Sequence, residues 1–156
     1  LTKLKDLEEL GILNVWTGIR FGMLLHYLED FFTMAHSRYF QGNLVAHIRY
    51  EVRLSRYIRA LFAGNYKLYD GDPDNTQVYS MEDLNERIVS LQKDYQKEIR
   101  EAEDETICFA TDLEYMNMAV QTVVGYMIPV MNRKTNMYHR LETRVMIQMP
   151  QRYHFL

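Results

Sequence analysis

Apolar residues along most of this chain recur at steps of three and four, the spacing that places side chains on one face of a helix. The first run begins near the amino terminus and contains Leu4, Leu7, Val15, Ile19, Leu25, Leu28 and Phe32. The second follows Asn43, a residue type well suited to cap a helix, and contains Leu44, Ile48, Val52, Ser55, Ile58 and Phe62. These runs predict helices over residues 3–38 and 44–66.

Two further runs predict helices over residues 81–104 and 112–148. The third follows a capping pattern at Ser80–Asp83 and contains Leu84, Ile88, Leu91, Tyr95 and Ile99. The fourth follows a similar pattern at Thr111–Glu114 and contains Leu113, Met116, Val120, Val123, Met127 and Met131. Since no glycine or proline lies between Asp74 and Val124, one continuous helix over the third and fourth runs is an open alternative.

Residues 64–80 interrupt the helical pattern. This stretch contains two glycines, one proline and three aspartates at alternate positions, which is typical of a loop. It divides the chain into two helical halves. The pattern therefore predicts an all-α fold in one domain over residues 1–156, a bundle of four long and mostly antiparallel helices with the loop between the second and third.

Composition is that of a globular protein. The 156 residues are 47% hydrophobic and 25% charged, with a net charge of −3 and one cysteine, Cys108. The negative charge argues against a generally basic nucleic-acid-binding protein, and the cysteine count leaves the compartment open. Two mainly apolar stretches, 10–28 and 115–132, contain polar residues and fall short of about 20 clean apolar residues, which argues against membrane insertion of this segment.

The second predicted helix carries a stripe of arginines at Arg49, Arg53, Arg56 and Arg59. The third predicted helix carries an excess of acidic residues. Opposite charges on helices of similar length predict that the arginines face the third helix within the fold, with RNA binding by the stripe as a less favoured alternative.

The first predicted helix is apolar around much of its circumference. Trp16 and Phe21 cannot both face the same neighbour as the main stripe, and Gly11, Gly18 and Gly22 fall near one face, where another backbone could approach closely. These five residues and the four arginines are the predicted interaction surface. The expected partners are other protein subunits or a second copy of this chain.

Three pairs of histidine and glutamate fall on common helical faces: His26 with Glu29, His47 with Glu51, and His139 with Glu142. Such pairs can bind transition metals, but further inward glutamates of the di-iron pattern are absent, so they are interpreted as surface ion pairs. Alternate aspartates at Asp70, Asp72 and Asp74 resemble the start of a calcium loop, yet the later positions depart from that pattern.

Signatures of enzymes are also missing from the sequence. The apolar surroundings of Cys108 would raise the pKa of its thiol, and neither a nucleophile elbow nor a phosphate-binding loop occurs. The prediction is therefore no catalytic residue, no metal site and no cofactor. The favoured function is a non-enzymatic structural or regulatory protein-interaction module in a larger assembly. The alternatives are a ligand-sensing bundle from a membrane receptor and an RNA-binding or RNA-packaging protein.

Overall fold

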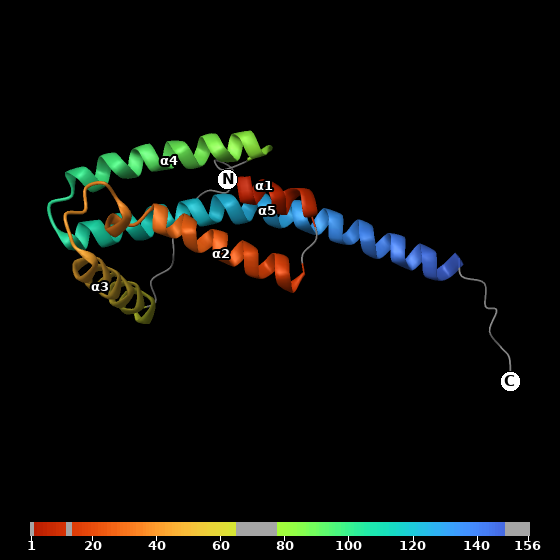
Figure 1. The fold of residues 1–156 in the computed structure, drawn as a ribbon, viewed down its shortest axis with the longest axis horizontal. Helices are drawn as coiled ribbons and strands as arrows, with labels where there is room; N and C mark the ends of the chain where they lie inside the picture. The colour runs from red at the N-terminus through yellow and green to blue at the C-terminus, as the bar shows by residue number, and fades with distance from the viewer. Residues whose placement is uncertain (1, 12–13, 65–77, 149–156) are drawn as a thin grey trace.

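The fold is all-α, as the sequence pattern predicts. A computed structural model describes residues 2–11, 14–64 and 78–148, with the side chains of 132–148 left out. These parts form five α-helices and a short 3₁₀-helix: α1 (Thr2–Leu10), α2 (Val15–Phe31), η1 (Met34–His36), α3 (Leu44–Ala63), α4 (Met81–Glu101) and α5 (Glu105–Gln148) (Figure 1). No strand occurs in the described ranges.

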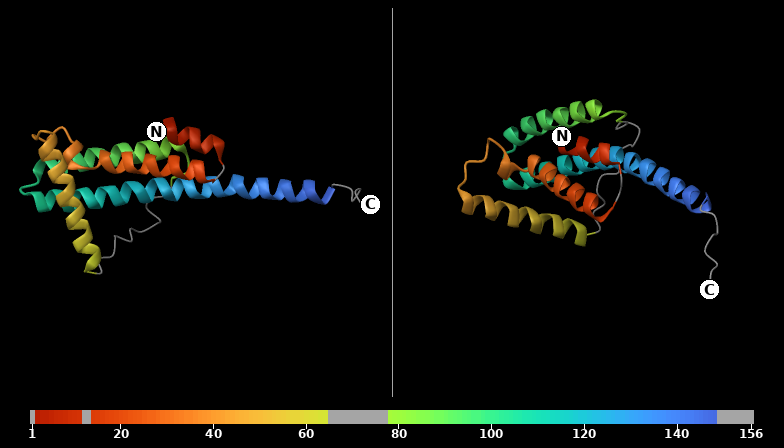
Figure 2. Two further views of the ribbon diagram at one scale, coloured as in Figure 1. Left: turned by 60° about the horizontal axis from the view of Figure 1, so that its bottom comes forward. Right: turned by 45° about the vertical axis from the view of Figure 1, so that its right-hand side comes forward.

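The long helix α5 is the element against which the others pack. Helices α1, α2, α3 and α4, and also η1, all contact it. Helices α2 and α4 run antiparallel to the first part of α5, whereas α3 crosses the end of the molecule where α5 begins (Figures 1 and 2). The prediction of four helices is therefore too simple, because the described residues before position 65 form three helices and a 3₁₀ turn.

The prediction of one continuous helix over 3–38 is wrong, because α1, α2 and η1 occupy this range. Gly11 has a φ of 58°, in the left-handed region that favours glycine, and its N–H donates to the carbonyl of Leu7 at the end of α1. Helix α2 then starts with a new cap, in which the Asn14 side chain and Thr17 exchange hydrogen bonds with each other's backbone N–H. It ends at Phe31, so the chain turns before η1.

Helix α3 buries a different face from the predicted one. Tyr50 and Leu54 are buried, while Leu44 and Val52 of the predicted stripe are exposed. Asn43 caps the helix through the N–H of Ala46, as expected, and the helix ends at Ala63. The face is different because α3 packs sideways on η1 and the start of α5, and not lengthwise in a bundle.

The boundary between α4 and α5 lies earlier than predicted. Residues 102–104 separate the two helices, so the alternative of one continuous helix is wrong. The Asp104 side chain accepts hydrogen bonds from the N–H groups of Thr106 and Ile107, and α5 therefore begins at Glu105, with Thr111 buried inside it. The predicted buried face of α4, from Leu84 to Ile99, is confirmed.

Some sequence-based predictions lie outside the described residues. They are the loop at 65–77 with its alternate aspartates and the side chains of His139 and Glu142. Among the described helices, none combines the length and the apolar character that a membrane span requires.

Candidate metal centre

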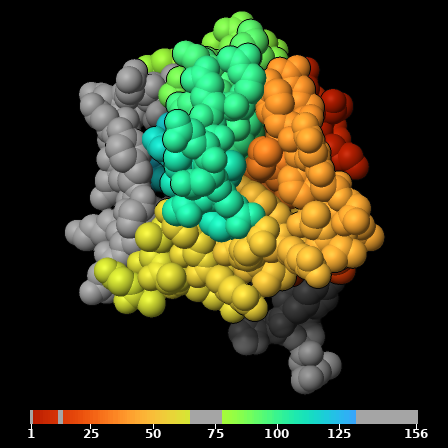
Figure 3. Space-filling model, turned by 90° about the vertical axis from the view of Figure 1, so that its left-hand side faces the viewer, coloured from red at the N-terminus to blue at the C-terminus, as the bar shows by residue number. Residues whose placement is uncertain are grey.

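Three chain segments meet at the end of the molecule where α5 begins: the end of α2, the 3₁₀-helix η1 and the first half of α3. Figure 3 looks onto this end, with α3 in yellow lying across it, next to the orange segment that precedes it. Each segment contributes a histidine or a carboxylate. The close approach of η1 and α3 depends on the chain reversal between Phe31 and Leu44, which a single helix over 3–38 would have prevented.

His36, His47 and Glu51 form the centre of this group. Nε2 of His47 lies 3.0 Å from Oε1 of Glu51, and Nε2 of His36 lies 3.3 Å from the same oxygen. The two imidazole rings pack edge to face with centroids 4.5 Å apart. One donor atom from each of the three residues lies within 4.8 Å of the other two, close enough for the three to share one metal ion.

Two residues of α2 extend the group. Oδ1 of Asp30 lies 3.7 Å from Nε2 of His36, and its Oδ2 lies 3.8 Å from Nε2 of His26, one turn earlier in α2. The side chain of Asp30 is about one-third exposed, whereas His26 is largely open to solvent. A continuous series of histidines and carboxylates therefore runs from α2 through η1 to α3.

Glu29, which the sequence analysis pairs with His26, is half-buried, and burial raises the pKa of its carboxyl. Nε2 of His26 lies 3.8 Å from the carboxylate of Asp30, the residue after Glu29.

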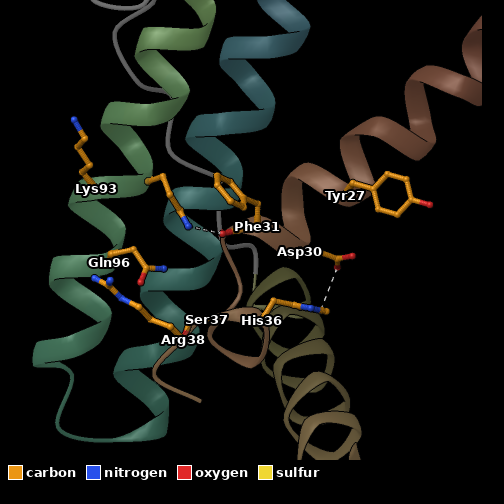
Figure 4. A pocket seen from close by; sticks show the side chains of 9 residues that line it. Tyr27, Asp30, Phe31, His36, Ser37, Arg38, Lys93 and Gln96 are labelled. Atoms are coloured by element: carbon orange, nitrogen blue, oxygen red, sulfur yellow. Dashed lines mark hydrogen bonds and ion pairs between the residues drawn. The ribbon is translucent and has the colours of Figure 1, made fainter. Parts of the chain in front are cut away.

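A cavity of about 660 Å³ opens beside this group. Asp30 and His36 lie on one side and Lys93 and Gln96 of α4 on the other (Figure 4), and Gln92 of α4 also lines the cavity. The remaining lining residues are Tyr27, Phe31, Ser37 and Arg38. Two cationic side chains, those of Arg38 and Lys93, therefore line the same cavity as Asp30 and His36.

A second cavity of about 300 Å³ adjoins the first along Tyr27 and Phe31, which line both. Its other lining residues are apolar: Leu4, Leu24, Leu28, Ile88 and Val123. A cavity that several charged and polar side chains line and an almost entirely apolar cavity thus share one wall, formed by two aromatic residues of α2.

The predicted interaction residues of the first helix do not form one surface. Phe21 is buried in the core and Gly11 ends α1 in a buried position, whereas Trp16 is 76% exposed. A Cβ added at Gly18 or Gly22 would meet no atom within 4 Å, so no part of the described chain packs closely on these glycines.

The arginine stripe lies elsewhere than predicted. Arg49, Arg53, Arg56 and Arg59 are exposed on α3, and α3 makes its main contacts with η1 and α5. Arg53 pairs with Glu105 at the start of α5. The prediction that these arginines face the acidic helix α4 is therefore wrong, because α3 crosses the end of the molecule.

The sequence analysis identified the pair His47–Glu51 but overlooked Asp30 and His36. A usable signal was present. Histidine precedes a carboxylate by four residues twice, at His26–Asp30 and at His47–Glu51, and His36 stands between the two pairs. Only the turn after α2 brings these separate pairs together, which spacing within a single helix cannot reveal.

Comparison with known families gives one match. A family model described as zinc-dependent phospholipase C matches residues 4–102, well over half of the chain, so the chain belongs to this family. The matched range contains all five residues from His26 to Glu51 that form the group described above. No curated protein and no solved structure shows significant similarity to the chain.

This match overturns the function predicted from the sequence. The family is one of lipid-hydrolysing enzymes, so the prediction of a non-enzymatic interaction module is wrong, as are its alternatives, a receptor sensing domain and an RNA-binding protein. The physical reason for the error is that the histidines and carboxylates of this group come from three separate segments. No segment alone carries a complete catalytic or metal-binding motif.

Proposed function

We propose that this chain carries the zinc centre of a phospholipase C, which hydrolyses a phosphate ester bond of phospholipids, and that His36, His47 and Glu51 hold the metal. The observation that carries the proposal is the convergence of these three side chains from η1 and α3 beside a cavity. Membership in the zinc-dependent phospholipase C family supports the class of metal and of substrate.

The donor atoms suit zinc. Imidazole nitrogen and carboxylate oxygen are common zinc ligands, with bond lengths of about 2.0–2.2 Å, so two donors on one ion lie no more than about 4.4 Å apart. Glu51 already lies 3.0 Å from His47 and 3.3 Å from His36. Three protein ligands also match catalytic zinc sites, which keep a further position for water or substrate.

Asp30 and His26 continue the group toward the first cavity. A carboxylate that faces the metal-binding nitrogen of a histidine can itself contribute an oxygen ligand to the ion. Oδ1 of Asp30 lies 3.7 Å from Nε2 of His36, the nitrogen that also faces Glu51, and Asp30 lines the cavity. Bound zinc would lower the pKa of a coordinated water to about 7 and polarise a phosphoryl oxygen.

The two adjoining cavities suit an amphiphilic substrate. Arg38 and Lys93 line the larger cavity and can attract the negatively charged phosphate of a lipid headgroup. The smaller cavity is lined almost entirely by apolar side chains and can shelter part of an acyl chain from water. Tyr27 and Phe31, which line both, would then lie at the junction of headgroup and chain.

The test combines metal content with phospholipid hydrolysis. The purified chain should bind zinc, and its hydrolysis of phospholipid vesicles should disappear after chelation and return when zinc is added. His36→Ala, His47→Ala and Glu51→Gln should each lower the activity by at least about a hundredfold. Glu101→Gln is the matched control, because it removes an exposed carboxylate from α4, distant in sequence from the centre.

The proposal fails if the wild-type chain retains full activity without zinc. It also fails if Glu51→Gln and Glu101→Gln bind zinc and hydrolyse phospholipid equally well.

A further inference from the structure

The carboxylate of Asp112, in the first part of α5, joins three other elements inside the core. The side chain is fully buried. Its Oδ1 accepts a hydrogen bond of 2.8 Å from the hydroxyl of Tyr95 in α4, and its Oδ2 accepts one of 2.8 Å from the hydroxyl of Tyr50 in α3. Both oxygens also accept from the backbone N–H of Met34, at the start of η1, and each lies 3.1 Å from its nitrogen.

Two of these three partners lie next to residues of the metal centre. Met34 begins the 3₁₀ turn that ends at His36. Tyr50 directly precedes Glu51 and follows His47 by three residues in α3. One carboxylate therefore binds both segments that supply the centre, although Asp112 itself contacts none of its ligands and lies beyond residues 4–102.

The 3₁₀ turn depends on this contact more than a longer helix would. It has only three residues, and Thr33, which precedes it, makes no side-chain cap. So short a turn has little stability of its own. Asp112 supplies the acceptor that a local cap would otherwise provide, from a position 78 residues further along the chain.

We propose that Asp112 is a positioning residue for the zinc centre: by binding Met34 and Tyr50 at once, it sets the position of His36 relative to His47 and Glu51. This inference rests on the proposed function. Tyr95 donates the remaining hydrogen bond to the Asp112 carboxylate. It belongs to α4, a helix that contributes no residue to the centre.

The cost of burying the group supports a role beyond packing. Burial raises the pKa of Asp112 to about 6, which reflects the loss of hydration of the charged form. Because removing a charged group from water is costly, a buried charge is weak evidence for a role in stability alone. A buried carboxylate that binds both ligand-bearing segments gives them a fixed geometry, which an apolar residue would not.

The test compares three variants that alter the same hydrogen-bond group. Asp112→Asn keeps the shape but loses acceptor capacity, Tyr50→Phe removes the bond to α3, and Tyr95→Phe removes the bond to α4. Zinc affinity is measured by competition with a chromophoric chelator. The geometry of the centre is followed by the visible absorption of bound Co²⁺, and stability by urea unfolding.

The expected result separates metal binding from stability. Asp112→Asn and Tyr50→Phe should weaken zinc binding by roughly tenfold and alter the cobalt spectrum, the lower end of the range for a direct outer partner of a metal site, because Asp112 acts on the segments and not on a ligand. Tyr95→Phe should lower stability by a similar amount to Tyr50→Phe, since each removes one hydroxyl from the carboxylate. Its zinc affinity and cobalt spectrum should nevertheless stay close to those of the wild type.

Three outcomes would overturn the inference. If Tyr95→Phe weakens zinc binding as much as Tyr50→Phe, or if neither variant changes it, Asp112 is a structural residue only. The comparison of these two tyrosine variants decides the matter even if Asp112→Asn does not fold. A wild-type chain that binds no zinc would instead remove the proposed function, and this inference with it.

Discussion

Nε2 of His36 lies 3.3 Å from Oε1 of Glu51, although 15 residues and a change of chain direction separate them. The carboxylate oxygen is shared, because Nε2 of His47 approaches the same atom within 3.0 Å. Where imidazoles converge on one carboxylate beside a cavity, a divalent cation can replace the contacts among them with metal–ligand bonds. The five residues of the series should therefore differ in how much each contributes to metal binding.

Asp30 should contribute to zinc binding, whereas Glu29 should not. Asp30→Asn removes the charge that lies 3.7 Å from His36, so zinc affinity should fall roughly tenfold or more. Glu29→Gln is the matched control, one residue earlier in the same helix. Chelator competition measures both affinities, and an equal loss in the two variants would contradict the assignment of Asp30.

The stability of the fold should depend on the ionisation of Asp112. The pKa of its carboxyl is raised to about 6 from an ordinary value of 3.8, so between these pH values the folded protein holds a proton that the unfolded chain has released. The contribution of Asp112 is then fully present below about pH 4 and declines as pH rises to about 6. The expected slope is at most ~1.4 kcal/mol per pH unit in the free energy of unfolding.

Asp112→Asn isolates the pH dependence that Asp112 causes, because every other titrating group is present in both the wild type and this variant. The difference in unfolding free energy between the wild type and this variant should change from pH 4 to pH 6, in favour of the variant as pH rises. Urea titrations at several pH values measure it. A constant difference over this interval would mean that Asp112 titrates near its ordinary pKa.

Replacement by alanine should change the stability of the fold in opposite directions at Gly11 and at Gly18. Gly11→Ala places a Cβ at a φ of 58° and should destabilise the fold by about 1 kcal/mol. Gly18→Ala fills open space inside α2 and should be neutral or stabilise by roughly 0.5–1 kcal/mol. Thermal unfolding of both variants tests the observed break between α1 and α2 against one continuous helix, in which both substitutions would be tolerated.

The sequence pattern predicts those parts of the fold whose burial follows from local periodicity. Leu84, Ile88, Leu91, Tyr95 and Ile99 lie on one face of α4, and this face is buried as expected. On α3 the same reasoning selects Leu44 and Val52, which are exposed, because the helix crosses the end of the molecule and presents Tyr50 and Leu54 instead. Periodicity identifies an apolar face but not the direction in which a helix packs.

The candidate metal centre could be predicted only in part, for a related reason. His47 and Glu51 are one turn apart in α3, and their proximity follows from helix geometry alone. Asp30 and His36 lie beside them because the chain turns after Phe31. Asp112, 78 residues after Met34, binds the backbone of that turn. A contact at such a separation leaves no trace in the spacing of residues. The overlooked feature was the grouping of three histidines and two carboxylates within residues 26–51.

The cationic wall of the larger cavity should matter for binding the phosphate of the substrate. Arg38→Ala combined with Lys93→Ala should raise KM for phospholipid vesicles several-fold and change kcat less, because neither residue belongs to the zinc centre. Lys97→Ala, an exposed lysine one helical turn after Lys93 in α4, is the control. A larger effect from Lys97→Ala than from the double variant would point to general attraction of the vesicle surface.

The smaller cavity should influence the preference for acyl chain length. Leu24 is half-buried and lines this cavity, so Leu24→Trp should fill part of its volume of about 300 Å³. Hydrolysis of phospholipids with long acyl chains should then slow by roughly tenfold, while a soluble phospholipid with very short chains should be hydrolysed at the wild-type rate, because its chains bury less apolar area. Met23→Trp places the same side chain at a neighbouring exposed position of α2 and should affect neither substrate. If Leu24→Trp slows both substrates equally, the cavity does not receive the acyl chain, and the larger cavity alone accommodates the substrate.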